Sequence, residues 1–279
     1  MPIGIILAAY GTLFLPALAT YDQIRKAYEH IFPGSPVRLA ITSHLMRKRL
    51  QENVGIRVQS LSAAREELCG LGSESVVVQS LQIVPGVEFH QVAALVQGWK
   101  GTKPAFSSLE IGLPLLSDLP DCRRVSSLLP AFCSGPAYRR DPEKEAVLLV
   151  GHGTGHPADA LYSLMSMVLK KDHKNVFLGT MEGFASLTEI LPELKGSGVK
   201  IVRLLPFLLV AGGHAENDIF GQSPLSWKST LEKEGYEVVV DRHGLGERGE
   251  IVSLFLNHTR NALKKMENES LAKQRVPFE

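Results

Sequence analysis

Two long apolar runs, each ending in glycine and histidine, most constrain how this chain can fold. Residues 147–150 run apolar into a Gly-His step at His152, and residues 201–210 run apolar into an Ala-Gly-Gly-His step at His214. Unbroken apolar runs that stop at glycine are typical of strands buried on both faces of a parallel sheet. We therefore expect both histidines at the carboxyl ends of strands, the edge where α/β sheets bind ligands.

Strand patterns alternate with helix patterns along the whole chain. Strands are predicted at 3–9, 37–42, 75–84, 109–113, 147–150, 176–179, 199–210 and 237–241. Helices are predicted at 17–31, 60–70, 89–98, 157–171, 187–194, 219–235 and 251–265, with one short helix in a Pro-, Ser- and Gly-rich connector at 101–141. Such alternation predicts an α/β fold with mostly parallel sheets flanked by helices.

The two halves of the chain echo each other. ILAAYGTLFLPALATYDQI resembles VLLVGHGTGHPADALYSLM, and VVVQSLQIVPGVEFHQV resembles VRLLPFLLVAGGHAEND. The second alignment sets Glu88 opposite His214, and His90 opposite Glu216. A repeat of this length predicts a duplicated α/β unit. We expect an N-terminal lobe with connector at 1–141, a C-terminal lobe at 142–279, and a cleft between them.

Composition narrows the function classes. The formal net charge is +1, which gives a nucleic-acid role no overall electrostatic support. The apolar start is too short to span a membrane and is typical of a first strand. The three cysteines, Cys69, Cys122 and Cys133, form no CxxC pair, which favours a reducing compartment. We expect a cytoplasmic protein with neither a nucleic-acid nor a membrane partner.

Three side chains could form a metal or proton-transfer site. His152 and His214 each follow a strand, and Glu182 follows the strand predicted at 176–179. Two imidazoles and a carboxylate suit divalent Co, Ni, Fe or Zn and leave positions open for substrate. The alternatives are an imidazole that caps a loop carbonyl, for His152, and an acid near a helix start, for Glu182.

Other polar residues have weaker patterns. Glu216 and Asp218 either orient His214 or compensate a helix dipole. Glu88 and His90 could accept protons or guide a metal inward. His156 has at least as good a case for a structural role at a helix start, and His44 is ambiguous. The remaining histidines, His30, His173, His243 and His258, are expected to be surface or structural residues.

Common nucleotide and hydrolase motifs are absent from the sequence. There is no GxxxxGK[ST] phosphate loop, no GxGxxG after the first strand and no GxSxG nucleophile elbow. The GHGTG segment could cradle a phosphate at a helix start, but no motif lysine accompanies it.

Five segments together resemble one family. GHGTGHPAD, GTMEG, PFLLVAGGHAENDIFG, AAYGT and QIVPGVEFH occur in an order similar to that of the anaerobic sirohydrochlorin cobalt chelatases of the CbiK type. The resemblance spans nearly the whole chain. It implies a two-lobed chelatase fold with a tetrapyrrole cleft, as in the related class II chelatases such as ferrochelatase. The implied activity is insertion of Co²⁺ into sirohydrochlorin without ATP, early in anaerobic cobalamin synthesis.

The resemblance also implies roles for single residues. His152 and His214 match histidines that hold the metal and accept pyrrole protons. Glu182 matches an acid that joins them as a ligand in some members, and Glu88 matches an acid of the facing lobe in others. Some members are exported and bind haem; this chain has no export signal in its sequence, so haem is not predicted. Members often form oligomers, so a homo-oligomer is one expectation.

Three rival functions remain open from the sequence. The same ligands suit Fe²⁺ or Ni²⁺ insertion, because ligand type does not separate these metals. A non-catalytic metal or tetrapyrrole carrier would use the same residues without turnover, and a sugar- or phosphate-binding module would not need the histidines. Because sirohydrochlorin carries eight carboxylates, basic side chains should line its site. The candidates are Arg47, Lys48, Arg49 and Arg203.

Overall fold

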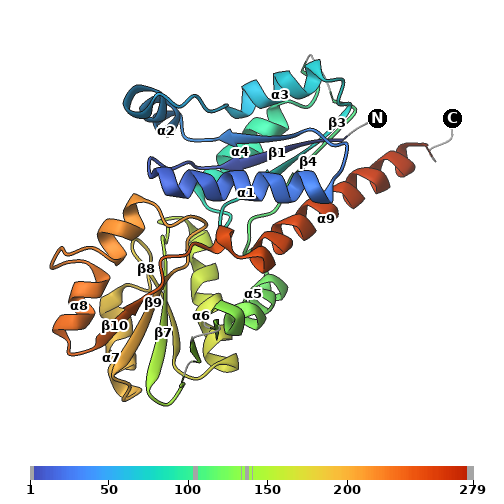
Figure 1. The fold of residues 1–279 in the computed structure, drawn as a ribbon. Coiled ribbons are helices and arrows are strands. Elements are labelled where there is room, and N and C mark those ends of the chain that lie inside the picture. The colour runs from blue at the N-terminus through green and yellow to red at the C-terminus, as the bar shows by residue number, and fades with distance from the viewer. Residues whose placement is uncertain (1–2, 103–105, 133, 136–137, 140, 275–279) are drawn as a thin grey trace. The chain divides into compact units, whose positions relative to one another are not determined.

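The computed structural model describes residues 3–102, 106–132, 134–135, 138–139 and 141–274, and Figure 1 traces the chain through them. Contacts between residues divide the chain into two compact units. The first comprises Met1–Leu115 and Val252–Glu279, and the second comprises Leu116–Ile251. This division differs from the lobes expected at 1–141 and 142–279, because the connector helix contacts the second unit and the final helix contacts the first.

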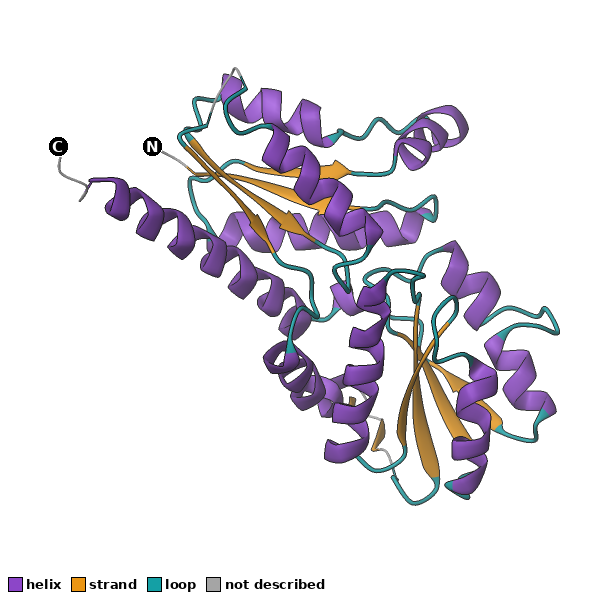
Figure 2. Cartoon of the chain, turned by 180° about the vertical axis from the view of Figure 1, so that it is seen from behind, coloured by secondary structure: helices purple, strands orange, loops and turns teal. Residues whose placement is uncertain are grey.

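The first unit is built on a four-stranded parallel sheet in the order β2-β1-β3-β4. Its strands are β1 (Ile3–Ala9), β2 (Val37–Ile41), β3 (Ser75–Ser80) and β4 (Ser108–Gly112). Its helices are α1 (Leu15–Ile31), α2 (His44–Arg49), the π-helical turn η1 (Leu50–Val54), α3 (Leu61–Gly70), α4 (Val87–Gly98) and most of α9 (Gly249–Gln274). Figure 2 shows helices on both faces of this sheet, as the alternating pattern predicted.

The second unit has a four-stranded parallel sheet in the order β10-β9-β7-β8. Its strands are β7 (Glu145–Gly151), β8 (Val176–Thr180), β9 (Ile201–Pro206) and β10 (Glu237–Val240). Its helices are α5 (Leu119–Phe132), η2 (Pro157–Asp159), α6 (Ala160–Asp172), α7 (Leu187–Gly196), η3 (Ala215–Ile219), α8 (Trp227–Lys233) and η4 (Leu245–Glu247). A short antiparallel ribbon joins β5 (Ser134–Gly135) to β6 (Tyr138–Arg139).

The two sheets have the same topology, which confirms the predicted repeat. Read from β8, the second sheet runs β8-β7-β9-β10, so each unit places its second, first, third and fourth strands in that order. The turn after the first strand is also repeated. Gly11 follows Tyr10, Gly153 follows His152, and both glycines have a positive φ, +110° and +78°. Tyr10 therefore occupies the position in the first unit that His152 occupies in the second.

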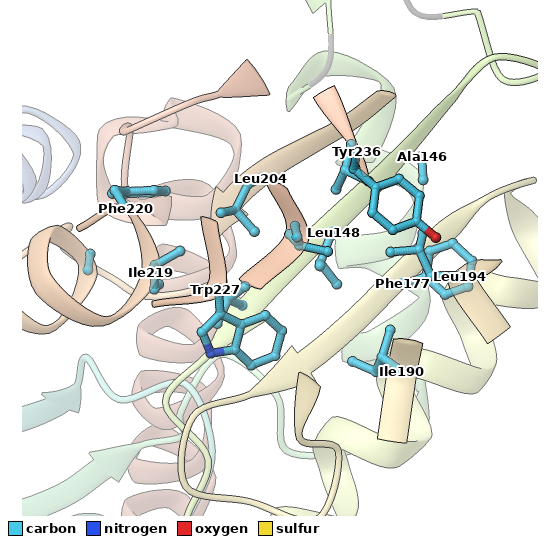
Figure 3. Close-up of a cluster of buried hydrophobic side chains, with 14 of the residues drawn as sticks. Ala146, Leu148, Phe177, Ile190, Leu194, Leu204, Ile219, Phe220, Trp227 and Tyr236 are labelled. Carbon is cyan, nitrogen blue, oxygen red and sulfur yellow. The ribbon is translucent and has the colours of Figure 1, made fainter. Parts of the chain in front are cut away.

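On one face of each sheet, an apolar cluster packs against two helices. In the second unit, Leu148 and Leu204 from the strands pack with Ile190 of α7 and Trp227 of α8, as Figure 3 shows. In the first unit, strand residues such as Val78 pack against α3 and α4. Each fully buried aliphatic side chain stabilises the fold by roughly 1.5–3 kcal/mol. β1 and β7 are nearly continuous apolar runs because their side chains are buried on both faces of the sheets.

The final helix completes the first unit from the opposite face of its sheet. Thr259 of α9 donates its hydroxyl to Gln79 Oε1 at 2.8 Å and lies 3.1 Å from the Tyr28 hydroxyl. Ala262 and Met266 pack on Val77 of β3. Because these contacts are buried, α9 is an integral part of the first unit.

Several predicted elements differ in extent. The apolar run at 199–210 forms a strand only to Pro206, because the carbonyls of Leu208 and Leu209 then bond the η4 segment instead of a strand. The helix expected at 219–235 is replaced by η3 and α8, and α8 begins after its N-cap Ser226. α2 was not predicted, because none of its residues is buried and it has no apolar periodicity.

Two further observations concern expectations from composition. Within the described ranges, no helix is long and apolar enough to cross a bilayer. Cys69 and Cys122 are free thiols, and Cys133 lies outside the described residues.

Candidate functional site

His152 and His214 lie together at one edge of the second sheet. β7 delivers His152 directly, and the loop after the neighbouring strand β9 delivers His214. Their rings are 5.3 Å apart between centroids and meet edge to face, with an interplanar angle of 78°. Residues more than sixty positions apart meet here because adjacent parallel strands end at the same edge.

Both imidazoles use the same nitrogen for a contact within the protein. Nδ1 of His152 lies 3.1 Å from the carbonyl oxygen of Gly153, and Nδ1 of His214 lies 3.2 Å from Oδ2 of Asp218. A carbonyl and a carboxylate can only accept, so each Nδ1 carries the hydrogen and donates it. Neither Nε2 has a hydrogen-bond partner among the described residues. Each neutral ring therefore keeps an Nε2 lone pair for a metal or a proton.

Glu182 lies beside His152 and not beside both histidines. Its Oε2 is 3.7 Å from Nδ1 of His152, and more than half of its side chain is exposed. The Glu182 N–H donates to the His152 carbonyl at 2.8 Å, which continues the β7–β8 hydrogen bonding past the strand ends. In the part of the chain that the structure describes, no three His, Cys, Asp or Glu side chains are grouped closely enough to hold a metal ion.

Gly153 lets the loops that carry His152 and Glu182 approach each other. Its φ of +78° is unfavourable for residues with a side chain, and a Cβ there would lie 2.4 Å from the backbone nitrogen of Gly183. Only glycine fits this position without a shift of one loop.

Asp159, which the sequence analysis missed, joins the same two loops. Its Oδ1 accepts the N–H of Thr154 at 3.0 Å, and its Oδ2 accepts the N–H of Phe184 at 2.9 Å. One carboxylate in η2 thus fixes the segment after His152 and the segment after Glu182. Hydrogen bonds to a charged acceptor are about twice as strong as neutral ones, so Asp159 is a positioning residue for both.

The two acids that follow His214 have different partners. Asp218 lies against Nδ1 of His214, as described above, which matches the expected orienting contact. Glu216 instead forms an ion pair with Arg242, and the Arg242 guanidinium lies 4.9 Å from the centre of the Phe220 ring. Glu216 therefore stabilises the loop around η3 and does not contact the imidazole in this structure.

The remaining predicted acid belongs to the first unit. Glu88 is exposed in the first turn of α4, with no ion pair among the described residues, and His90 follows two positions later in the same helix. The aromatic ring of His90 lies 5.5 Å from that of Phe89. The repeat gives Glu88 the place after β3 that His214 has after β9.

Other histidines have structural partners. His156 is the N-cap of η2, where its Nδ1 accepts the Ala158 N–H, and this contact confirms a structural role at the helix start. His258 Nδ1 is 2.9 Å from the Leu113 carbonyl, and His173 Nε2 is 2.9 Å from the Ser126 carbonyl.

The basic candidates differ in what they already bind. Arg203 forms a largely buried ion pair with Glu145, 2.8 Å between Nε and Oε1, near the start of β9, so we no longer assign it to substrate binding. Arg47, Lys48 and Arg49 lie in α2, and none of them is buried.

The fold is that of the chelatases. The sirohydrochlorin chelatase SirB from Bacillus subtilis subspecies spizizenii, solved in complex with cobalt, has a TM-score of 0.63 and 13% identity, over 96% of this chain and 98% of that one. This likeness establishes the two-lobed chelatase fold. The chain itself belongs to the cobalt chelatase (CbiK) family, which it matches over residues 3–264.

Two curated relatives extend this assignment. The sirohydrochlorin cobaltochelatase CbiKC of Nitratidesulfovibrio vulgaris is 36% identical over 265 residues, covering 95% of this chain and 92% of that protein. The sirohydrochlorin cobaltochelatase of Salmonella typhimurium is 30% identical over 238 residues, covering 85% of this chain and 87% of that protein. The resemblance seen in the sequence is thereby confirmed.

Proposed function

We propose that this protein inserts Co²⁺ into sirohydrochlorin, in the synthesis of cobalamin. Family membership and the names of both relatives support this activity. The observation that carries the proposal is the paired geometry of His152 and His214. Each ring has its Nδ1 bound to an acceptor and its Nε2 available at the ligand-binding edge of the sheet.

The metal is a substrate, so its site must release it. Two imidazole donors satisfy only part of the coordination of Co²⁺ and leave positions that the pyrrole nitrogens can take. Insertion replaces two pyrrole N–H bonds by two Co–N bonds and releases two protons. When the metal leaves an Nε2 lone pair, that same lone pair can accept a proton, so His152 and His214 serve as ligands and then as bases.

The acids have supporting roles in this proposal. Glu182 is a third ligand candidate because it follows β8 at the same edge of the sheet and matches an acid that is a ligand in some family members. Glu88, assigned through the family resemblance, accepts protons or guides the metal from the first unit. Distortion of the macrocycle on binding would expose its nitrogen lone pairs.

Several finer expectations belong to the same proposal. Insertion needs no ATP, and Fe²⁺ is the alternative metal for the same ligands. A bound haem is not predicted. We further infer a cytoplasmic protein with no nucleic-acid or membrane partner, for which a homo-oligomer is one arrangement to test by light scattering.

Anaerobic assays with sirohydrochlorin and Co²⁺ test this function. We expect wild-type protein to accelerate the absorbance change over the protein-free rate, and His152→Ala and His214→Ala each to reduce that acceleration at least tenfold, about 1.4 kcal/mol in the barrier. His30→Ala, an exposed histidine of the first unit, is the matched control. A rate no faster than without protein would refute the enzyme.

A non-catalytic carrier is the second candidate, because the same nitrogens would hold metal in it. An assay with less protein than sirohydrochlorin distinguishes the enzyme from the carrier. An enzyme converts many equivalents of sirohydrochlorin, whereas a carrier stops at one equivalent per site.

A further inference from the structure

We propose that the first unit binds carboxylate groups of the tetrapyrrole substrate in a basic cavity at the end of β2. This proposal rests on the function proposed above. The cavity has a volume of about 450 Å³ and is open to solvent. The residues that carry the argument are His44, Arg47 and Lys48 of α2, Gln51 of η1, and Arg57 and Ser60 of the following segment.

The charge of the basic cavity has a single sign. Three of its lining residues are Arg or Lys, and none is Asp or Glu. Arg57 has no ion pair or hydrogen bond from its side chain among the described residues. Among the described residues, Lys48 pairs only with Glu52, 3.9 Å away, and both side chains are more than half exposed. An exposed pair at this distance contributes little, so Lys48 is available to an incoming anion.

Two other arginines of this unit have closer acidic partners. Arg25 lies 2.6 Å from Asp22, and Arg38 lies 2.7 Å from Glu67. The chain as a whole has nearly equal numbers of acidic and basic residues. A cluster of cations that acids do not balance is therefore a local feature of this cavity, and such clusters attract anions.

Arg47 is held in place by the backbone. Its Nη1 donates to the carbonyl oxygens of Ile41 and Thr42, at 2.5 and 2.8 Å. The structure gives Nε and Nη2 no partner among the described residues. These two nitrogens form one edge of the guanidinium plane, and that edge matches the two oxygens of a carboxylate. Because the side chain is already fixed, binding a carboxylate costs it little entropy.

The repeat places the basic cavity at a ligand-binding edge. The Ser43 N–H donates to the Tyr10 carbonyl, as the Glu182 N–H donates to the His152 carbonyl in the second unit. α2 thus follows β2 at the point where the Glu182 loop follows β8. Carboxyl ends of parallel strands are where α/β units bind ligands, and a π-helical turn such as η1 is frequent at functional sites.

The ligand chemistry is a carboxylate on a multiply charged tetrapyrrole. Eight carboxylates on sirohydrochlorin supply several negative groups on one rigid frame, which suits three cations in one cavity. Inorganic phosphate offers the same acceptor chemistry, so the experiment includes it as a competing source.

Titration of metal-free sirohydrochlorin against variants tests the basic cavity. The double variant Lys48→Ala/Arg57→Ala removes two cavity charges, and Lys26→Ala/Lys100→Ala removes two exposed charges of the same unit that do not line it. We expect the cavity variant to raise Kd and KM about tenfold, with kcat within twofold, and the control pair to change neither more than twofold. The difference should shrink at high salt.

Each other outcome overturns the proposal in a distinguishable way. If wild type metallates sirohydrochlorin and the cavity variant binds it with the same Kd and KM, the basic cavity does not bind the substrate, and the proposed function stands. If the control pair weakens binding equally, the effect is general charge. If inorganic phosphate displaces sirohydrochlorin from wild type more than chloride at equal ionic strength does, the cavity is a phosphate site. If wild type neither binds nor metallates sirohydrochlorin, the proposed function fails with it.

Discussion

Asp218 lies four residues after His214, and its Oδ2 is 3.2 Å from Nδ1 of that imidazole across the π-helical turn η3. The contact sets which ring nitrogen carries the hydrogen and which way the ring faces. Carboxylates in this position around metal-binding histidines typically change affinity or activity by 10–100-fold. The residue therefore acts through His214 and is a positioning residue.

We expect Asp218→Ala to lower Co²⁺ affinity and kcat by about tenfold and to leave sirohydrochlorin affinity unchanged. Asp218→Asn should retain more of both, because its amide oxygen can still accept the Nδ1 hydrogen. Cobalt titration by visible absorbance and steady-state kinetics measure the two effects. Glu216→Ala is the control from the same turn; if it matched Asp218→Ala, the contact with His214 would not explain the loss.

Replacing Asp159 should loosen two loops at once. Asp159→Ala removes the acceptors of the Thr154 and Phe184 N–H groups and should lower the free energy of unfolding by about 2–3 kcal/mol. It should also reduce kcat more than it raises KM. Asp159→Asn keeps one acceptor and should give about half the loss in urea denaturation. Equal losses for Asn and Ala would contradict the two-bond account.

Gly153→Ala should separate the His152 and Glu182 loops. The new Cβ would meet the Gly183 nitrogen at 2.4 Å in a backbone conformation that alanine rarely adopts, at a cost of about 1–3 kcal/mol. We expect lower thermal stability and at least a tenfold loss of kcat. Gly155→Ala in the same loop is the matched control, because a Cβ there meets nothing within 4 Å. Similar damage from both substitutions would show that the loop tolerates no alanine for another reason.

Asp241 should make stability depend on acid pH. Partial burial raises the pKa of its carboxyl, but hydrogen bonds from His243 and the nearby Arg248 outweigh burial and hold the pKa below its ordinary value of 3.8. Because the folded-state pKa is the lower one, the stabilisation is fully present above the unfolded pKa and is lost as pH falls through the folded pKa.

We therefore expect Asp241→Asn to lower the free energy of unfolding by about 2 kcal/mol at pH 7 and by progressively less below about pH 4. Urea denaturation across this range measures the difference. Glu237→Gln, at the exposed start of β10, should change little at any pH. A constant Asp241→Asn difference down to pH 3 would mean that the carboxyl charge is not the stabilising feature.

Sequence patterns predicted the strands well where the strand residues are buried and therefore apolar. β1 has its predicted bounds, and all but its first residue are buried. β7 is buried throughout and extends the strand predicted at 147–150 to Glu145–Gly151. α2 could not be predicted, since its contacts are a Ser43 cap and an exposed surface that leave no apolar period. The extent of β9 was overpredicted, because an apolar segment can equally bond a loop, as residues 207–210 do.

The candidate site was predictable only in part, because sequence patterns indicate strand ends but not contacts between loops. Glycine and histidine after apolar runs indicated His152 and His214, because strand ends can be read from sequence. Asp159 gave no such signal: its partners Thr154 and Phe184 meet it only after two loops fold side by side. Likewise, the contrast between Asp218 and Glu216 depends on the twist of one helical turn.

The helix α9 has a consequence for the order in which the protein is made. Residues 1–115 are synthesised first, yet the first unit also needs the segment from Val252 onward. Until that segment leaves the ribosome, Gln79 and Tyr28 lack the Thr259 hydroxyl, and Val77 lacks its apolar cover. The second unit can therefore fold before the first unit has received α9. The first unit, whose N-terminal segment is synthesised first, is thus the last to complete its structure.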